Sequence, residues 1–461
     1  MKFGGAALRD GPAIERSARL VEREARKGRI LLVVSAQEGV TAQLARAVDE
    51  AVRGDLQPWD GLRVRHRSVL AQLGLEGDLL DRHLLELRGI LEELQRSARA
   101  ERRMCDYVLS FGERMSARVV AALLRRLGTS ATPLDAYDLG LTTASRHGEG
   151  ALLAAPAPAL RAQLASVPGI PVVTGFLALD PAGHLTTLGP NGSDLTAVWF
   201  GEAVGAEEVV LWKAVAGFLT ADPDLVPEAR RIPVLGRDQA IELAVHGAEV
   251  IHAGALEPAA RGGIVVRVAD VADPDAPGSR IEATTPHAGP LGIAHRTGIA
   301  RYRETLSLGR DQGAQLAELF GALAAAGLEP YRASYSGRAA VALVADDDRT
   351  EAFASGRAPR AELVRGLAAF AVVGRELEGE AGLEARVRDL AGRTGVRIER
   401  APGDPSPSSL VFLAPATDLE RVVRAVHAGL FGSTRPAGSD ELLPQPGTSK
   451  EAARTRPGRR E

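Results

Sequence analysis

The first five residues combine a lysine with two glycines in a way that suits phosphate chemistry. Lys2 and Phe3 lead directly into Gly4 and Gly5. Glycine amides can approach phosphate oxygens closely, and an ammonium group supplies a point charge for a phosphoryl group. Taken alone, a Gly-Gly pair after a strand is more often a simple turn. Lysine is rare in this chain, however, and two of the four lysines fall in candidate nucleotide motifs: Lys2, Lys27, Lys213 and Lys450.

Six further motifs follow the first one in order along the chain. They are Ser35–Thr41 (SAQEGVT), Gly112–Ser116 (GERMS), Thr174–Phe176 (TGF), Thr187–Asp194 (TLGPNGSD), Leu219–Pro223 (LTADP) and Gly247–His252 (GAEVIH). Together with Lys2–Gly5 they span residues 1–284 at the spacing found in aspartate kinases, and the chain resembles that family.

Apolar strands and helical stretches alternate through residues 1–284, which indicates an α/β domain. Ile30–Ser35, Ile170–Thr174 and Glu208–Trp212 are expected to be buried strands that run into glycine-rich or polar loops. Ligands bind at such strand ends in open parallel sheets. Leu70–Ala100 is expected to form a pair of exposed helices, and Ser110–Leu127 one further helix.

Two similar units follow, each with a strand, a helix and a strand. The expected elements are Thr305–Leu308, Gln315–Ala325 and Ala339–Val344, then Ala369–Val373, Leu383–Thr394, Ser409–Leu413 and a last helix Asp418–Leu430. The repeat resembles paired ACT domains, which commonly bind amino-acid effectors. The resemblance implies an amino-acid kinase three-layer sandwich with a mainly parallel sheet over 1–284. It also implies two α+β ACT (ferredoxin-like) domains over 285–360 and 361–431. Residues 432–461, rich in Gly, Pro, Ser and charge, are expected to be a disordered tail.

The resemblance also implies a role for individual residues. Lys2, Gly4 and Gly5 would face the γ-phosphate of ATP, with Lys2 and Asp194 as catalytic residues. The substrate set would comprise Ser35, Thr41, Glu113 and Gly192, with Glu113 facing the ammonium group of aspartate. The nucleotide set would add Ser193, Lys213, Phe218, Asp222 and Pro223, the last three on the adenine side. No protein metal cage is expected, so Mg²⁺ would arrive with ATP. For Glu113 the alternative is a solvated helix carboxylate.

Four positions depart from the family pattern. Ala6 and Ala7 replace two hydroxyl residues, and Ala214 replaces an acid after Lys213. Pro190 stands where the family has an arginine that binds the α-carboxylate of the substrate, and proline has no donor. The expected activity is ATP-dependent phosphorylation of the L-aspartate β-carboxylate, the first step of lysine, threonine and methionine synthesis, in weakened form. The alternatives are a catalytically degenerate paralogue with a regulatory or scaffold role, another acyl-phosphate-forming kinase of this fold, or a substrate without an α-carboxylate.

Composition limits the remaining possibilities. The net charge of −3 offers no electrostatic case for binding nucleic acid or an anionic membrane, and no apolar run reaches the roughly 20 residues of a membrane span. A single cysteine, Cys105, fits a reducing cytoplasm. A homodimer through residues 289–431 is expected, because Thr305–Leu308 and Ala339–Val344 are too apolar to remain as free sheet edges.

Overall fold

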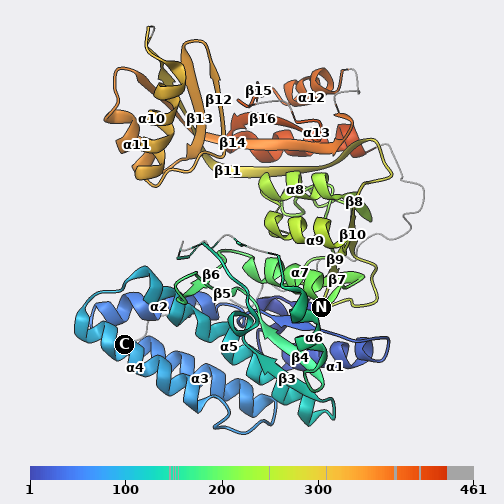
Figure 1. The fold of residues 1–461 in the computed structure, drawn as a ribbon. Helices are drawn as coiled ribbons and strands as arrows, with labels where there is room; N and C mark the ends of the chain where they lie inside the picture. Colours follow the sequence, from blue (N-terminus) through green and yellow to red (C-terminus); the bar gives the residue numbers. More distant parts are fainter. Residues whose placement is uncertain are drawn as a thin grey trace, which may run out of the picture.

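Two large sheets organise the chain, one above the other in Figure 1. The computed structural model describes residues 1–144, 147–148, 150, 152–153, 155–248, 250–307, 309–377, 382–403 and 406–432. The eight-stranded sheet takes its strands from residues 2–282 and the six-stranded sheet from residues 289–415. The tail expected over 432–461 lies, apart from Gly432, outside the described residues.

The eight-stranded sheet has the order β3-β4-β2-β1-β7-β9-β10-β8. The six strands from β3 to β9 are parallel, whereas β10 pairs antiparallel with β9 and parallel with β8. Its strands are β1 (Lys2–Phe3), β2 (Leu32–Val34), β3 (Ala131–Leu134), β4 (Ile170–Thr174), β7 (Glu208–Lys213), β8 (Val234–Gly236), β9 (Val265–Asp270) and β10 (Ser279–Glu282). A separate hairpin contains β5 (Leu177–Leu179) and β6 (Leu185–Thr187).

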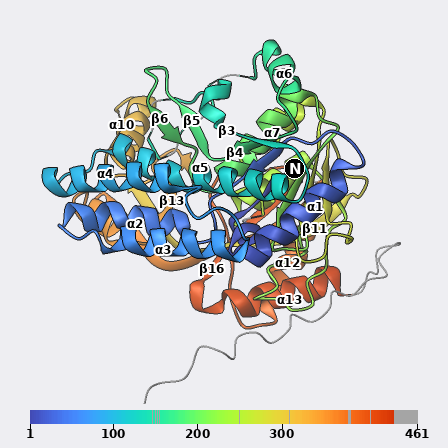
Figure 2. The ribbon, with the colours of Figure 1, turned by 90° about the horizontal axis from the view of Figure 1, so that it is seen from below.

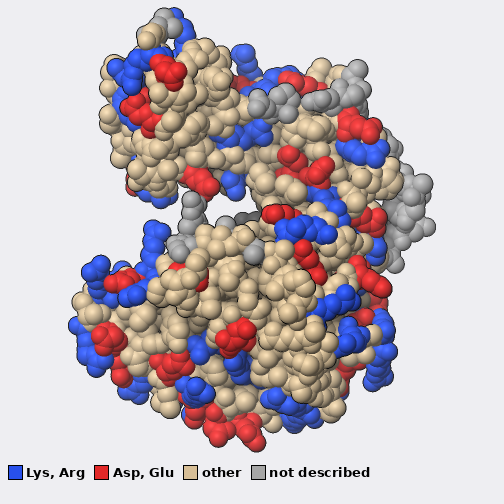
Figure 3. Space-filling view, in the orientation of Figure 1, with Lys and Arg blue, Asp and Glu red and all other residues tan. Residues whose placement is uncertain are grey.

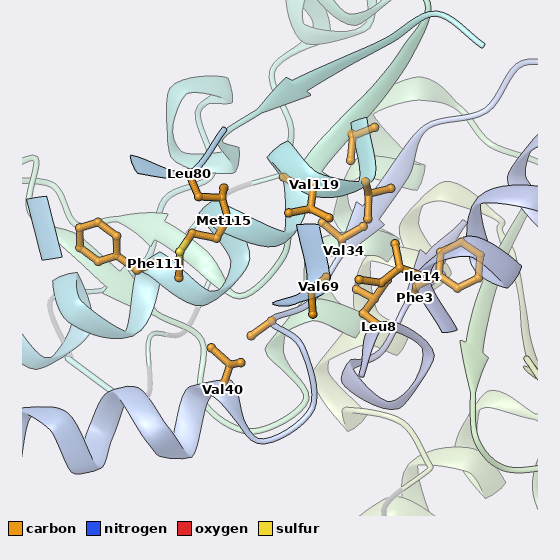
Figure 4. Close-up of a cluster of buried hydrophobic side chains, with 14 of the residues drawn as sticks. Phe3, Leu8, Ile14, Val34, Val40, Val69, Leu80, Phe111, Met115 and Val119 are labelled. Carbon is orange, nitrogen blue, oxygen red and sulfur yellow. The ribbon is translucent and has the colours of Figure 1, made fainter. Parts of the chain in front are cut away.

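Helices cover both faces of this sheet, because its strands are apolar on both sides. Leu32 and Val34 belong to a core cluster with α1–α5, and Figure 4 shows Val34 among the side chains of this cluster. Val33 belongs to a cluster with α6–α9, as the two-residue period of a strand requires. The resulting three-layer α/β sandwich with a mainly parallel sheet confirms the predicted fold class. The helices are α1 (Gly11–Ala25), α2 (Val40–Val52), α3 (Gln57–Gln72), α4 (Asp81–Ser97), α5 (Arg102–Arg126), α6 (Pro158–Ala165), α7 (Gly192–Val204), α8 (Arg237–Val245) and α9 (Leu256–Gly262).

The prediction of two exposed helices within Leu70–Ala100 was wrong in both extent and exposure. The first of the two, α3, begins at Gln57 and ends at Gln72, before α4 starts at Asp81. α2 lies between α3 and α4 (Figure 2), and α4 buries a leucine on every turn: Leu84, Leu87, Leu91 and Leu94. Charged residues between these leucines lie on the solvent face, which is why composition alone made the segment look exposed.

The six-stranded sheet is antiparallel throughout, with the order β12-β13-β11-β14-β16-β15. Its strands are β11 (Gly289–Thr305), β12 (Arg332–Ser336), β13 (Ala339–Ala345), β14 (Ala361–Arg375), β15 (Glu399–Arg400) and β16 (Ser409–Pro415). The helices of this region are α10 (Gln312–Ala325), α11 (Asp348–Ser355), α12 (Leu383–Gly392) and α13 (Leu419–Phe431).

The two units of this sheet are interleaved along the chain. Strand β11 runs through both: Ile293 packs in the core of α12 and α13, whereas Ala300 and Tyr302 pack in the core of α10 and α11. The opposite face of the sheet shares a hydrophobic cluster with the first half of the chain, including α8 and α9. The predicted boundary between the two ACT units, at residues 360 and 361, therefore stays a prediction. The structure adds that residues 289–296, from the first predicted unit, pack with the second.

The two segments predicted to be free sheet edges are not edges. Strand β11 ends at Thr305, so Thr305–Leu308 is not a strand, and Leu308 itself lies outside the described residues. Ala339–Val344 belongs to β13, which pairs on both sides with β12 and β11. The edges are β12 and the two-residue β15. The periodicity of the sequence located β13 correctly but could not reveal its neighbours.

The visible surface carries both signs of charge, interspersed over both halves of the molecule (Figure 3). Within the described ranges, no helix combines the length and the apolar character needed to cross a membrane.

Candidate active site

Four parallel strands end at one edge of the first sheet and bring distant motifs together. Lys2 lies in β1, and β1 pairs with β2 on one side and β7 on the other. Ser35 directly follows β2, Gly175 follows β4, and Lys213 ends β7. Because the carboxyl ends of parallel strands share one edge, these residues surround a common space, at the position where ligands bind in open α/β sheets.

A buried carboxylate joins the two lysines at this edge. Lys2 Nζ donates to Asp194 Oδ1 and Lys213 Nζ donates to Asp194 Oδ2, each at 2.7 Å. Asp194 is fully buried in the first turn of α7, where the helix dipole favours a carboxylate. Burial opposes its ionisation, but the two ammonium groups outweigh that effect and lower the pKa of Asp194. Burial also lowers the pKa of Lys213, against the opposing influence of Asp194.

Close packing of glycines positions Asp194. A Cβ on Gly175 would lie 2.6 Å from Ser193 Cβ and Oγ, and a Cβ on Gly192 would lie 2.5 Å from Leu188 Cβ. Only hydrogen at these two positions lets the start of α7 approach the loop after β4 and the segment after β6. The TGF and NGSD motifs are therefore also packing motifs, which bring the Asp194 carboxylate between the two lysines.

Glu113 reaches the same edge from α5. A Cβ on the preceding Gly112 would lie 2.7 Å from Ala36 Cβ, so glycine allows α5 to contact the loop after β2. There Glu113 Oε1 accepts a hydrogen bond from Ala36 N at 2.9 Å, while Oε2 has no partner among the described residues. Burial raises the pKa of Glu113 to about 8. Its alternative interpretation as a solvated carboxylate is excluded, since the residue is only 3% exposed.

These groups enclose a pocket of about 740 Å³. Nine of the predicted site residues line it: Lys2, Gly4, Gly5, Ser35, Thr41, Glu113, Gly192, Ser193 and Lys213. Asp194 lies behind the two lysines. The three predicted adenine-side residues do not line this pocket: the Phe218 ring is buried in the core, and Asp222 and Pro223 follow it in the β7–β8 connection. The roles assigned to all of these residues stay predictions.

The departures from the family pattern also lie at the pocket. Ala6, Pro190 and Ala214 line it, whereas Ala7 is buried beside it. Among the described lining residues the cationic side chains are Lys2 and Lys213, and both are bound to Asp194. In the part of the pocket lining that the structure describes, no guanidinium group replaces the arginine that the family has at position 190.

Two site residues were missed by sequence reasoning. Asp106 is 1% exposed; its Oδ1 accepts from Thr187 Oγ1 at 2.7 Å, and its Oδ2 accepts from Gly148 N at 3.1 Å. Thr187 and Gly148 line the pocket, so Asp106 fixes part of its wall. The sequence did offer a signal for Asp106. Glu113 follows it by two helical turns in α5, which places the two carboxylates on the same face of the helix. The second missed residue is Gln37, which lines the pocket and lies inside the SAQEGVT motif.

Comparison with known proteins agrees with this geometry. The model of the Amino acid kinase family matches residues 1–270. Lysine-sensitive aspartokinase 3 of Escherichia coli is 30% identical over 454 residues, which cover 93% of this chain and 98% of that protein. Aspartokinase 1 of Arabidopsis thaliana, a chloroplastic protein, is 34% identical over 295 residues; the match covers 62% of this chain and only 52% of the relative.

Solved structures extend the similarity to the whole fold. E. coli aspartokinase III in complex with aspartate and ADP (R-state) superimposes with a TM-score of 0.81 at 28% identity, covering 93% of this chain and 99% of that one. The same enzyme in complex with lysine and aspartate (T-state) gives a TM-score of 0.74, covering 93% and 98%. The chain therefore belongs to the amino acid kinase family and, within it, to the aspartokinases.

Proposed function

We propose that this aspartokinase family member binds ATP and transfers its γ-phosphoryl group to the β-carboxylate of L-aspartate, with reduced efficiency. The observation that carries the proposal is the Lys2–Asp194–Lys213 array at the ends of β1 and β7. Each ammonium group uses one of its hydrogens on Asp194 and keeps two for phosphate oxygens. The array carries a net positive charge and is held rigidly, which suits stabilisation of the charge that develops during phosphoryl transfer.

The acceptor chemistry requires no general base. The β-carboxylate of aspartate is already ionised near neutral pH and can attack the phosphorus directly, giving an acyl phosphate and ADP. Among the described residues no group of three or more His, Cys, Asp or Glu could hold a metal ion, and both Asp194 oxygens are bound to lysines. Mg²⁺ would therefore enter on the nucleotide, where it neutralises phosphate charge.

Reduced efficiency follows from the missing donors. A hydrogen bond from a cation to a carboxylate contributes about 1.5–3 kcal/mol, so proline at position 190 weakens aspartate binding by roughly 10–150-fold. Loss of a transition-state donor lowers the rate by about 10²–10³, and such losses are not additive. Ala6 and Ala214, both at the pocket, supply no such donor.

The second candidate is a degenerate paralogue that regulates or scaffolds an active partner. The observation in its favour is that the described lining residues include no free cation for the substrate.

In either case we propose a cytoplasmic homodimer that assembles through residues 289–431 and binds an amino-acid effector there. The E. coli relative has been solved with lysine, which makes lysine the first effector to test.

Hydroxylamine trapping of an acyl phosphate distinguishes the two candidates. Purified protein with Mg-ATP and L-aspartate should form aspartyl hydroxamate, and Lys2→Ala should abolish both this product and most of the thermal shift caused by Mg-ATP. Lys27→Ala is the matched control, because Lys27 is an exposed lysine paired with Glu24 on the surface. A thermal shift without hydroxamate supports the regulatory paralogue. The absence of both in the parent protein would remove the kinase proposal.

A further inference from the structure

His147 is a histidine beside the pocket wall to which the proposed function gives no task. It lies between β3 and α6, and its side chain is 18% exposed. His147 Nδ1 lies 2.9 Å from Asp106 Oδ2 of α5. Both oxygens of Asp106 act as acceptors for other groups as well, so the imidazole donates Nδ1–H to this carboxylate.

The Asp106 carboxylate holds two parts of the pocket wall together. Its Oδ1 accepts from Thr187 Oγ1 at 2.7 Å, and its Oδ2 accepts from Gly148 N at 3.1 Å. Gly150 N donates in turn to Thr187 O at 2.8 Å, so the segment with His147 is bound to the same threonine. Thr187 and Gly148 line the pocket. Asp106 and His147 are not among its described lining residues, so they act on a ligand through the wall that they hold.

The helix that carries Asp106 indicates which ligand this wall serves. Leu109 and Glu113 follow Asp106 by three and seven residues in α5, so the three share one face of the helix. Leu109 and Glu113 both line the pocket, and Glu113 is the residue predicted to face the ammonium group of aspartate. Lys213, of the predicted nucleotide set, lines the pocket from the end of β7. The wall held by Asp106 is therefore on the acceptor side.

A buried carboxylate depends on each of its donors. Asp106 is 1% exposed, so bulk water does not replace a donor that is removed. Without the imidazole, the segment with His147 loses one of its two described bonds to this carboxylate and keeps the bond from Gly148 N. A wall that moves by about 1 Å can cost as much as about 10²-fold in rate, although the moved residue performs no chemistry.

We propose that His147 and Asp106 form a positioning pair for the acceptor amino acid. His147 orients the carboxylate, and the carboxylate in turn holds Thr187 and Gly148 in the pocket wall. This inference rests on the proposed function, because it concerns the acceptor side of the same site. The pair requires a donor at the position of Nδ1 and not an imidazole ring. Asparagine carries its amide nitrogen on Cγ, the atom to which Nδ1 of histidine is bonded, and can supply that donor.

Calorimetry of L-aspartate binding at saturating Mg-ADP tests the pair without turnover. His147→Leu should weaken L-aspartate binding about 10-fold or more, whereas His147→Asn should stay within about 3-fold of the parent. Neither variant should change the affinity for Mg-ADP by more than about 2-fold, because the pair lies on the acceptor side. His184→Leu is the matched control: His184 Nδ1 lies 3.4 Å from Asp180 Oδ2, and this pair is outside the described lining of the pocket. It should change neither affinity.

A double-mutant cycle shows whether the pair acts through Thr187. Thr187→Val removes the hydroxyl that donates to Asp106 Oδ1 and should also weaken L-aspartate binding. If both changes release the same wall, the double variant with His147→Leu should bind less weakly than the product of the two single losses. Losses that multiply in full would show two independent effects and would contradict the proposal.

Four further results would overturn the assignment. An unchanged aspartate affinity in His147→Leu would remove the role of the histidine, and equal losses in His147→Leu and His147→Asn would remove the role of the donor. Equal losses of Mg-ADP and L-aspartate affinity would indicate a general structural role. A parent protein that binds Mg-ADP but no L-aspartate would leave the pair no acceptor to position. Failure of the kinase proposal is recognised separately, as absence of hydroxamate from a protein that binds L-aspartate.

Discussion

A single buried carboxyl group, that of Glu113, couples the stability of the protein to its pocket. Burial raises the pKa of Glu113 to about 8, from an ordinary value of 4.5 that holds in the unfolded chain. The folded state therefore retains a proton that the unfolded state releases. The contribution of Glu113 to the free energy of unfolding is complete below pH 4.5 and is lost as the pH rises toward 8.

We expect Glu113→Gln to stabilise the empty protein at alkaline pH, because glutamine keeps the shape of the protonated acid and cannot ionise. The gain in free energy of unfolding should be at most about 1 kcal/mol at pH 5 and at most about 5 kcal/mol at pH 9. Urea denaturation at both pH values measures it. Glu15→Gln, at an exposed carboxylate of α1, serves as control. A gain that is equal at pH 5 and pH 9 would show that the group does not titrate in this range.

At the scale of elements, the connection between β7 and β8 is held by the second half of the chain. Ile293 N of β11 donates to Thr220 O at 2.8 Å, and Thr220 Oγ1 lies 2.9 Å from His427 Nε2 of α13. The same hydroxyl accepts from Arg230 N at 2.9 Å. The segment predicted to cover adenine is thus shaped by the sheet predicted to be regulatory.

Thr220→Val should loosen this connection while preserving its volume. The change leaves the partly buried Arg230 N–H without this acceptor, so we expect a loss of about 1 kcal/mol in the free energy of unfolding. Amide hydrogen exchange should accelerate in residues 219–231, and the Mg-ATP thermal shift should decrease. Thr132→Val, which removes one exposed bond to Pro168 O, is the control. Unaltered exchange in 219–231 would contradict this coupling.

At the scale of the whole molecule, the longer of the two edge strands of the second sheet is β12; the other edge is the two-residue β15. Tyr335 in β12 is 59% exposed and Phe320 of α10 is 39% exposed. A strand that is paired on one side only has a free row of backbone hydrogen-bonding groups, which favours pairing with a second chain. This edge now supports the homodimer prediction, in place of the two segments named from the sequence.

Light scattering should therefore show a dimer at micromolar concentration, and Tyr335→Arg should shift it toward monomer. Val64→Arg alters an equally exposed residue of α3, outside residues 289–431, and should leave the dimer intact. Truncation after Glu282 should give a poorly soluble fragment, because it uncovers the cluster that α8 and α9 share with the second sheet. A monomeric parent chain would refute the dimer, and a dimer insensitive to Tyr335→Arg would move its interface elsewhere.

Much of the fold was predictable because it depends on local patterns. A strand of a parallel sheet with two helical layers is buried on both faces and is therefore apolar throughout, as Ile170–Thr174 is. Such continuous apolar runs can be located in the sequence alone. The course of β11 through both units was not predictable. This seventeen-residue strand pairs with β14 along nearly its whole length and gains β13 as a second partner from Ile299 onward, and no period in the sequence marks that point.

The sequence by itself determined the family, the sandwich class and most of the residues around the pocket, because glycines and charged residues at strand ends keep their spacing regardless of the packing around them. Only the tertiary structure decided that Asp194 joins both lysines and that burial raises the pKa of Glu113. These properties depend on distances between residues far apart in the chain and on the exclusion of water. Packing sets both, and no local spacing encodes them.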